Sequence, residues 1–146
     1  MRVFISGVMQ GSREDHDVHA QDYRQLLTDA LRARYPGVEI LDPWAMHPGA
    51  VNYTPEQAKE TLLWEIELAR TCDLLIAYAP QASMGTSLEM WAAYQVGAPI
   101  FTISKMTRNW VIQSLSTRTV PTLEDFLAHV EAGGLDQFLD EARASG

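Results

Sequence analysis

Residues 73–89, DLLIAYAPQASMGTSLE, decide the fold of this chain. Their first part, 73–79, is short, apolar and ended by Pro80, which is typical of a strand buried in a parallel sheet. The small residues that follow predict a helix beginning at Gly85, with Ser83 available as its N-terminal cap. Because ligands of open α/β sheets lie beyond the carboxyl ends of strands, this junction is where a binding site is expected.

Strands and helices alternate on both sides of this stretch. Such alternation predicts a mostly parallel sheet with right-handed crossovers, an α/β three-layer sandwich of the flavodoxin or Rossmann type. Residues 42–53 hold two prolines and no periodic pattern, and we expect a long loop there. The other strands are predicted at 3–5, 38–41, 99–103 and, as a short edge strand, 117–120, and the other helices at 20–34, 54–71, 109–116, from about 122 to 132, and 135–144.

Length and charge bound the possible functions. The 146 residues predict one domain, 1–146, and the formal charge of −8 argues against a surface for nucleic acid or anionic membranes. A single cysteine, Cys72, excludes an internal disulfide bond. With no apolar stretch of membrane-spanning length and no signal-peptide pattern, the cytoplasm is the expected location.

The loop after the first strand, residues 6–15, reads SGVMQGSRED and is the first candidate site. Gly7 and Gly11 permit a tight turn that points backbone N–H groups at an anion, and Arg13 adds a positive charge. The spacing is neither that of a Walker A loop nor that of the dinucleotide fingerprint. An ordinary strand-to-helix turn with solvated charges remains the alternative interpretation.

The second candidate is Glu89, in the helix that begins near Gly85. Glu89 lies beside the predicted buried stripe of that helix and close to the strand ends, which favours a functional carboxylate. The alternative is that Glu89 lies on the wet face and that Ser83 only caps the helix. The predicted stripe consists of Met90, Ala92, Ala93 and Val96.

Glu65, in the helix before the central strand, is the third candidate. Its neighbours Trp64, Ile66 and Leu68 are apolar, so partial burial is expected to raise the pKa of its carboxyl toward the range of an acid catalyst. The alternative is an exposed helical glutamate without a role.

Together these positions resemble the nucleoside 2-deoxyribosyltransferase-like superfamily, in particular its nucleoside 5′-monophosphate N-glycosidase branch. The resemblance covers roughly residues 3–103. It rests on the first strand with its Ser-Gly and Gly-Ser-Arg-Glu-Asp loop, on Glu65, on Asp73 at the start of the third strand, and on Ser83-x-Gly85-x-x-x-Glu89.

The resemblance implies hydrolysis of a (deoxy)ribonucleoside 5′-monophosphate to free base and sugar phosphate, without a metal or other cofactor. Glu89 would act at the anomeric carbon C1′, where a fixed carboxylate stabilises or traps an oxocarbenium-like centre, and Glu65 would assist the departing base. The implied substrate-binding residues are Phe4, Gly7, Met9, Gln10, Gly11, Ser12, Arg13, Ser83, Met84 and Gly85.

Four departures from the family pattern bear on the substrate. Ser83 stands where deoxyribosyltransferases carry an Asp for the free 5′-hydroxyl, which favours a 5′-phosphate. Phe4 replaces the Tyr of deoxyribo-specific members and resembles the branch that hydrolyses ribonucleotides, such as the cytidine monophosphate hydrolases. Glu65 replaces the usual Asp, and Gln10 stands where some relatives have Arg, so the base preference is left open.

Two other functions and an assembly are left open at this stage. One alternative is a nucleoside 2-deoxyribosyltransferase, and another is a nucleotide-binding sensor without turnover. The resemblance implies a homodimer or larger oligomer, in which residues such as Asn109, Ser114 and Ser116 would complete a neighbouring site. The apolar helices carrying Trp64 and Trp91 are compatible with such a dimer or with ordinary core packing.

Overall fold

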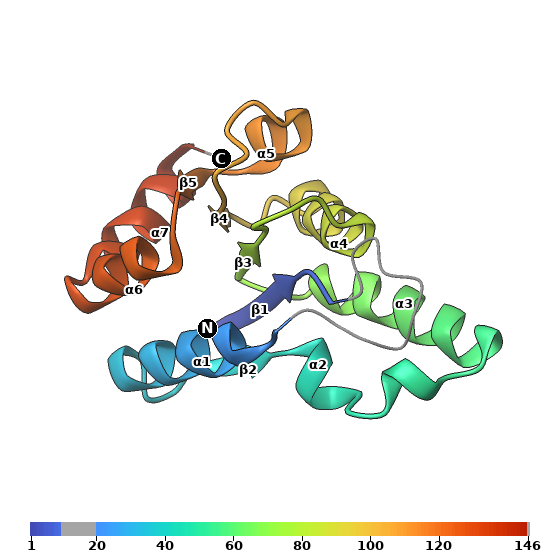
Figure 1. The fold of residues 1–146 in the computed structure, drawn as a ribbon. Helices are drawn as coiled ribbons and strands as arrows, with labels where there is room; N and C mark the ends of the chain where they lie inside the picture. Colours follow the sequence, from blue (N-terminus) through green and yellow to red (C-terminus); the bar gives the residue numbers. More distant parts are fainter. Residues whose placement is uncertain (10–19, 146) are drawn as a thin grey trace.

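A computed structural model describes residues 1–9 and 20–145 of the chain (Figure 1). Five parallel strands form one sheet in the order β2-β1-β3-β4-β5, which is the flavodoxin-like order and confirms the predicted fold class. The strands are β1 (Arg2–Gly7), β2 (Glu39–Leu41), β3 (Leu74–Tyr78), β4 (Ile100–Ile103) and β5 (Arg118–Val120). The helices are α1 (Asp22–Arg34), α2 (Pro43–Met46), the 3-10 turn η1 (Ala50–Asn52), α3 (Pro55–Ala69), α4 (Met84–Gln95), α5 (Trp110–Leu115), α6 (Leu123–Glu131) and α7 (Gly134–Ser145).

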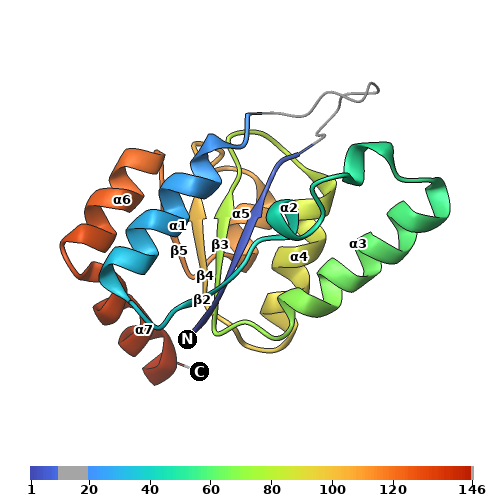
Figure 2. The same ribbon diagram turned by 90° about the horizontal axis from the view of Figure 1, so that it is seen from below.

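Helices cover both faces of the sheet and make three layers. Figure 2 shows α1, α6 and α7 on one face and α3 and α4 on the other. Side chains of β1 alternate accordingly: Val3 and Ile5 pack toward α1, whereas Phe4 packs in the core against α3 and α4. Among the described residues, no helix is both long and apolar enough to cross a membrane.

Local sequence signals account for most element boundaries. Thr54 and Gln57 form a capping box at the start of α3, with Pro55 in the first turn. Asn109 caps α5 and Thr122 caps α6 through their side chains. The expected edge strand at 117–120 is confirmed as β5, which pairs with β4 at the end of the sheet order.

Two expectations differ from the structure. Residues 42–53 are not one irregular loop, because Asp42 caps the short helix α2 by accepting a hydrogen bond from the Trp44 backbone N–H at 3.1 Å, and η1 follows. Val96 is not part of the buried stripe of α4. The helix ends at Gln95, and a turn through Gly97, which has φ of 76°, leaves Val96 half-exposed.

The topology places a switch point between β1 and β3, because the chain leaves these neighbouring strands in opposite directions along the sheet. Ser6 pairs with Ala77 and Gly7 with Tyr78 at the carboxyl ends of the two strands. β1 also runs past the end of β2, whose last residue pairs with Phe4. The end of β1 is therefore open on one side.

Gly7 lies against a pair of stacked rings at this edge. Tyr23 of α1 stacks on Tyr78 with the ring centroids 4.1 Å apart, and Tyr23 is buried. A Cβ on Gly7 would lie 2.8 Å from Cζ of Tyr23 and closer still to its hydroxyl oxygen. The absence of a side chain at Gly7 is therefore required for this stacking.

We expect Gly7→Ala to lower the free energy of unfolding by about 1–3 kcal/mol, because the added methyl group overpacks a buried ring. Urea unfolding followed by circular dichroism measures the loss. Gly37→Ala is the matched control, since a Cβ there meets no atom within 4 Å. Equal stability of the two variants would contradict the packing account.

Candidate active site

Glu89 lies at the switch point and is joined to the first strand. It lies in the second turn of α4 and is only 5% exposed, and its carboxylate accepts a hydrogen bond from the Ser6 hydroxyl of β1. Burial raises the pKa of Glu89 to about 8, whereas the Ser6 hydrogen bond acts in the opposite direction. The expectation that Glu89 lies beside the strand ends is therefore met.

Glu65 of α3 is the second buried carboxyl group at this place. α3 packs beside α4, and Glu65 is also only 5% exposed. Burial raises the pKa of Glu65 to about 7, as its apolar surroundings predicted, while the charge of Arg24 lowers it. The charge of Glu65 in turn contributes to the raised pKa of Glu89, so the two carboxyl groups lie near each other.

The two raised pKa values define what this pair can do chemically. Near neutral pH the pair can provide one carboxylate and one protonated carboxyl group, which is the combination that general acid and nucleophilic catalysis require. Within residues 1–9 and 20–145, no three His, Cys, Asp or Glu side chains are grouped so that they could bind a metal ion.

An ion pair that is almost fully buried lies beside these carboxyl groups. Arg24 of α1 bonds Asp42 through Nη1 and Oδ1 at 2.7 Å, and their side chains are 4% and 12% exposed. Neither Arg24 nor Asp42 was among the candidate site residues expected from the sequence, whereas Ser6 is the first residue of the candidate loop 6–15. A signal was present for Arg24, because it lies one turn before Leu27 and Thr28 on the buried side of α1, where a charge needs a partner.

The first turn of α4 provides the second half of the candidate site. Ser83 caps the helix, its hydroxyl accepting from the Thr86 backbone N–H at 3.4 Å. A Cβ on Gly85 would meet no atom within 4 Å, so Gly85 presents an open backbone surface. The Thr86 hydroxyl is buried and has no hydrogen-bond partner among the described residues. Met84 is 83% exposed.

The remaining predicted site residues fall into two groups. Phe4 is fully buried two residues before Ser6, on the same face of β1, and Gly7 ends that strand. Met9 follows the strand and is partly exposed. Gln10, Gly11, Ser12 and Arg13 lie outside the described residues. Of the predicted residues, the structure brings Glu89 and Glu65 together near the end of β1, and Ser83 and Gly85 lie at the start of the helix that carries Glu89.

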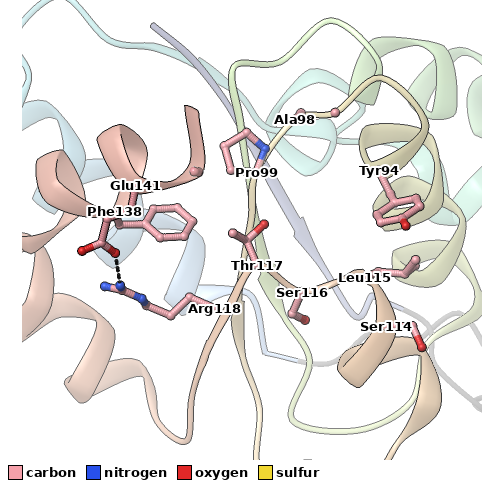
Figure 3. Close-up of a pocket in the computed structure, with 12 residues that line it drawn as sticks. Tyr94, Ala98, Pro99, Ser114, Leu115, Ser116, Thr117, Arg118, Phe138 and Glu141 are labelled. Carbon is pink, nitrogen blue, oxygen red and sulfur yellow. Dashed lines mark hydrogen bonds and ion pairs between the residues drawn. The ribbon is translucent and has the colours of Figure 1, made fainter. Parts of the chain in front are cut away.

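A cavity of about 600 Å³ lies at the opposite edge of the sheet, where β4 and β5 begin (Figure 3). Four of its polar side chains already have partners: those of Ser116, Thr117, Arg118 and Glu141. Arg118 pairs with Glu141 at 2.8 Å, the Ser116 hydroxyl is 2.7 Å from that of Thr102, and Thr117 accepts from the Ile100 backbone N–H. Neither Glu89 nor Glu65 lines this cavity.

Comparisons with known proteins bear on the fold. No protein-family model matches this chain, and no curated protein matches it. Among solved structures, the 2-deoxyribosyltransferase from Bacillus psychrosaccharolyticus matches with a TM-score of 0.65 and 15% identity, over 87% of this chain and 90% of that one. A conserved protein from Enterococcus faecalis V583 matches with a TM-score of 0.61 and 16% identity, over 90% and 98% of the two chains. These likenesses show that the chain has the fold of the Bacillus 2-deoxyribosyltransferase.

Proposed function

We propose that this protein hydrolyses the N-glycosidic bond of a (deoxy)ribonucleoside 5′-monophosphate, giving free base and (deoxy)ribose 5-phosphate. The observation that carries the proposal is the buried Glu89 carboxylate, fixed by Ser6 at the switch point and coupled to a second buried carboxyl group, Glu65. Two coupled carboxyl groups are the machinery that glycosidic cleavage uses.

The proposed reaction assigns one role to each carboxyl group. A Glu89 oxygen attacks C1′ as the C1′–N bond breaks, and the electron pair of that bond moves to the base. The proton of the Glu65 carboxyl neutralises the departing base. Water then attacks C1′ and gives its proton to Glu65, and the sugar phosphate separates from Glu89.

The start of α4 supports a phosphorylated substrate. Ser83 and the backbone N–H groups of the first turn offer donors to an anion, and the helix dipole favours negative charge there. A carboxylate at position 83 would repel a phosphate, whereas a serine hydroxyl bonds it. With Phe4 in the first strand, we extend the proposal to a ribonucleotide, with a pyrimidine base as in the cytidine monophosphate hydrolases.

Deoxyribosyl transfer between bases is the second candidate function, because a solved structure with this fold is named a 2-deoxyribosyltransferase. The two functions differ in the group that attacks C1′ in the second step: a water molecule in the hydrolase and another base in the transferase. Incubating a nucleoside with a second, labelled base separates them, since only a transferase forms the labelled nucleoside.

We further propose that the protein works as a homodimer in the cytoplasm. Five large apolar side chains on the neighbouring helices α3 and α4 are about half-exposed, and a second copy would cover them: Leu63, Trp64, Leu88, Trp91 and Tyr94. Sedimentation velocity is expected to show a dimer, and Trp91→Glu is expected to give a folded monomer. A monomeric wild-type protein would contradict this assembly.

We expect Glu89→Gln to lower kcat for base release by at least about 10³-fold, because an amide cannot attack C1′. Chromatographic measurement of free base from a panel of nucleoside 5′-monophosphates tests this effect. Glu56→Gln, in the first turn of α3, is the matched control and should retain wild-type activity. Full activity of the Glu89 variant would exclude the mechanism.

The pH dependence of kcat/KM should be bell-shaped around neutrality. The reactive form needs ionised Glu89 to attack and protonated Glu65 to donate. Because burial raises the pKa of Glu89 to about 8 and that of Glu65 to about 7, this reactive form is the minor singly protonated form, and kcat/KM should be greatest between these two values. Glu65→Gln should therefore remove the alkaline limb. An unchanged profile in this variant would refute the role of Glu65.

Gly85→Ala should raise KM for a nucleotide about 10-fold or more, because a methyl group would occupy the space in which phosphate approaches the backbone. The free energy of unfolding should stay the same or rise by up to about 1 kcal/mol, since alanine is the better helix former. Initial rates of base release at varied nucleotide concentration measure KM, and urea unfolding measures the stability. Unchanged nucleotide affinity would place the phosphate elsewhere.

A further inference from the structure

The end of β1 has a partner strand on one side and a guanidinium group on the other. Beyond Phe4, β1 pairs with β3 only, because β2 ends at Leu41. On the side of β1 that β2 leaves open, Arg24 donates hydrogen bonds to the backbone carbonyl groups of Ile5 and Gly7, at 3.0 and 3.2 Å. Arg24 therefore supplies the donors that a longer β2 would have supplied.

The two bonded carbonyl groups belong to the residues on either side of Ser6. The Ile5 carbonyl belongs to the peptide unit just before Ser6, and the Gly7 carbonyl belongs to the peptide unit just after Gly7, so Arg24 holds the strand on both sides of Ser6 and restricts the direction of its side chain. The Ser6 side chain points to the face of the sheet that α4 covers, where it donates to Glu89. Arg24, whose helix covers the opposite face of the sheet, thus bonds the strand segment from which Ser6 reaches Glu89.

Arg24 is itself held in a single orientation. Its Nε donates to Gln21 at 2.7 Å and its Nη1 to Asp42 at 2.7 Å. Asp42 is fixed in turn because the same carboxylate caps α2. Four hydrogen bonds of the planar guanidinium group thus join α1, the end of β1 and the residue after β2, a geometry that lysine cannot reproduce.

The charges around Glu89 come from four elements. Glu65 on α3 and Asp42 after β2 disfavour a negative charge on Glu89, whereas Arg24 on α1 and the Ser6 hydroxyl on β1 favour it. Of the other elements packed against α4, β3 carries one titratable residue, Tyr78, and the sequences of β4 and α5 carry none. In the part of the chain that the structure describes, Arg24 is therefore the positive charge that acts on Glu89.

We propose that Arg24 is a positioning residue for the reaction of Glu89. It holds the backbone carbonyl groups of the residues before and after Ser6, directs the Ser6 hydroxyl at the Glu89 carboxylate, and places a positive charge near the carboxyl pair. The inference rests on the proposed function for its kinetic readout and on the geometry alone for its structural readout.

The kinetic test uses Arg24→Lys, Ser6→Ala and the double variant. Arg24→Lys should lower kcat about 10- to 100-fold with KM within about 3-fold, because the misdirected carboxylate loses its near-attack position. In the Ser6→Ala background the same change should cost less than about 3-fold, because Arg24 acts through Ser6. Arg34→Lys is the control, since Arg34 lies on the same helix in a half-exposed pair with Asp136 and should leave kcat unchanged. Additive losses in the double variant would overturn the proposal.

A second test needs no turnover. Carboxyl NMR of the protein labelled at glutamate Cδ follows the titration of Glu89 in the wild type, Arg24→Lys and Arg24→Met. Arg24→Met should move the Glu89 titration to higher pH, because the favourable charge is lost, and Arg24→Lys should move it less. If Arg24→Met does not fold, the Arg24→Lys shift alone decides. An unmoved titration would refute the action of Arg24 on Glu89, whereas an inactive wild type with a moved titration would refute only the proposed function.

Discussion

The hydrogen bond between Ser6 and Glu89 is the interaction on which the rest of the candidate site depends. It joins the first strand to the helix after the third strand across the switch point of the sheet. Burying a charged carboxylate costs free energy unless a hydrogen-bond donor stabilises it or the group keeps its proton. Glu89 has a donor in Ser6, and its raised pKa also allows it to keep its proton near neutral pH. The reactivity of the site follows from this balance, since a small electrostatic change decides whether Glu89 is charged.

The early end of β2 helps to place the charge of Arg24 near Glu89. The sequence Asp42-Pro43 stops β2, because proline has no N–H for the ladder and the Asp42 carboxylate caps a helix instead. The carbonyl groups of Ile5 and Gly7 then need other donors, and Arg24 provides them. The short β2 strand thus leaves room for the buried Arg24–Asp42 pair, and this pair brings a positive charge close to Glu89.

Much of this fold could be predicted from local signals. The apolar run at 73–79, its breakers, and the capping residues Ser83 and Thr54 fix elements through interactions within a few residues. The raised pKa of Glu65 was also predictable from its apolar neighbours.

The rest depends on contacts between distant residues. Ser6 and Glu89 are 83 residues apart, so no local pattern joins them. The role of Arg24 depends on where β2 ends relative to β1, which is a matter of register and not of composition. Val96 was wrongly predicted to be buried because the helical pattern of apolar residues in the sequence continues past Gln95, where α4 ends before the turn at Gly97.

The most direct measurement is release of free base by the wild-type protein from all common ribo- and deoxyribonucleoside 5′-monophosphates, with the matching nucleosides alongside. The account predicts release from one or more nucleotides and none from the nucleosides, because the start of α4 selects for a phosphate. Silence across the panel, or equal release from nucleosides, would contradict it.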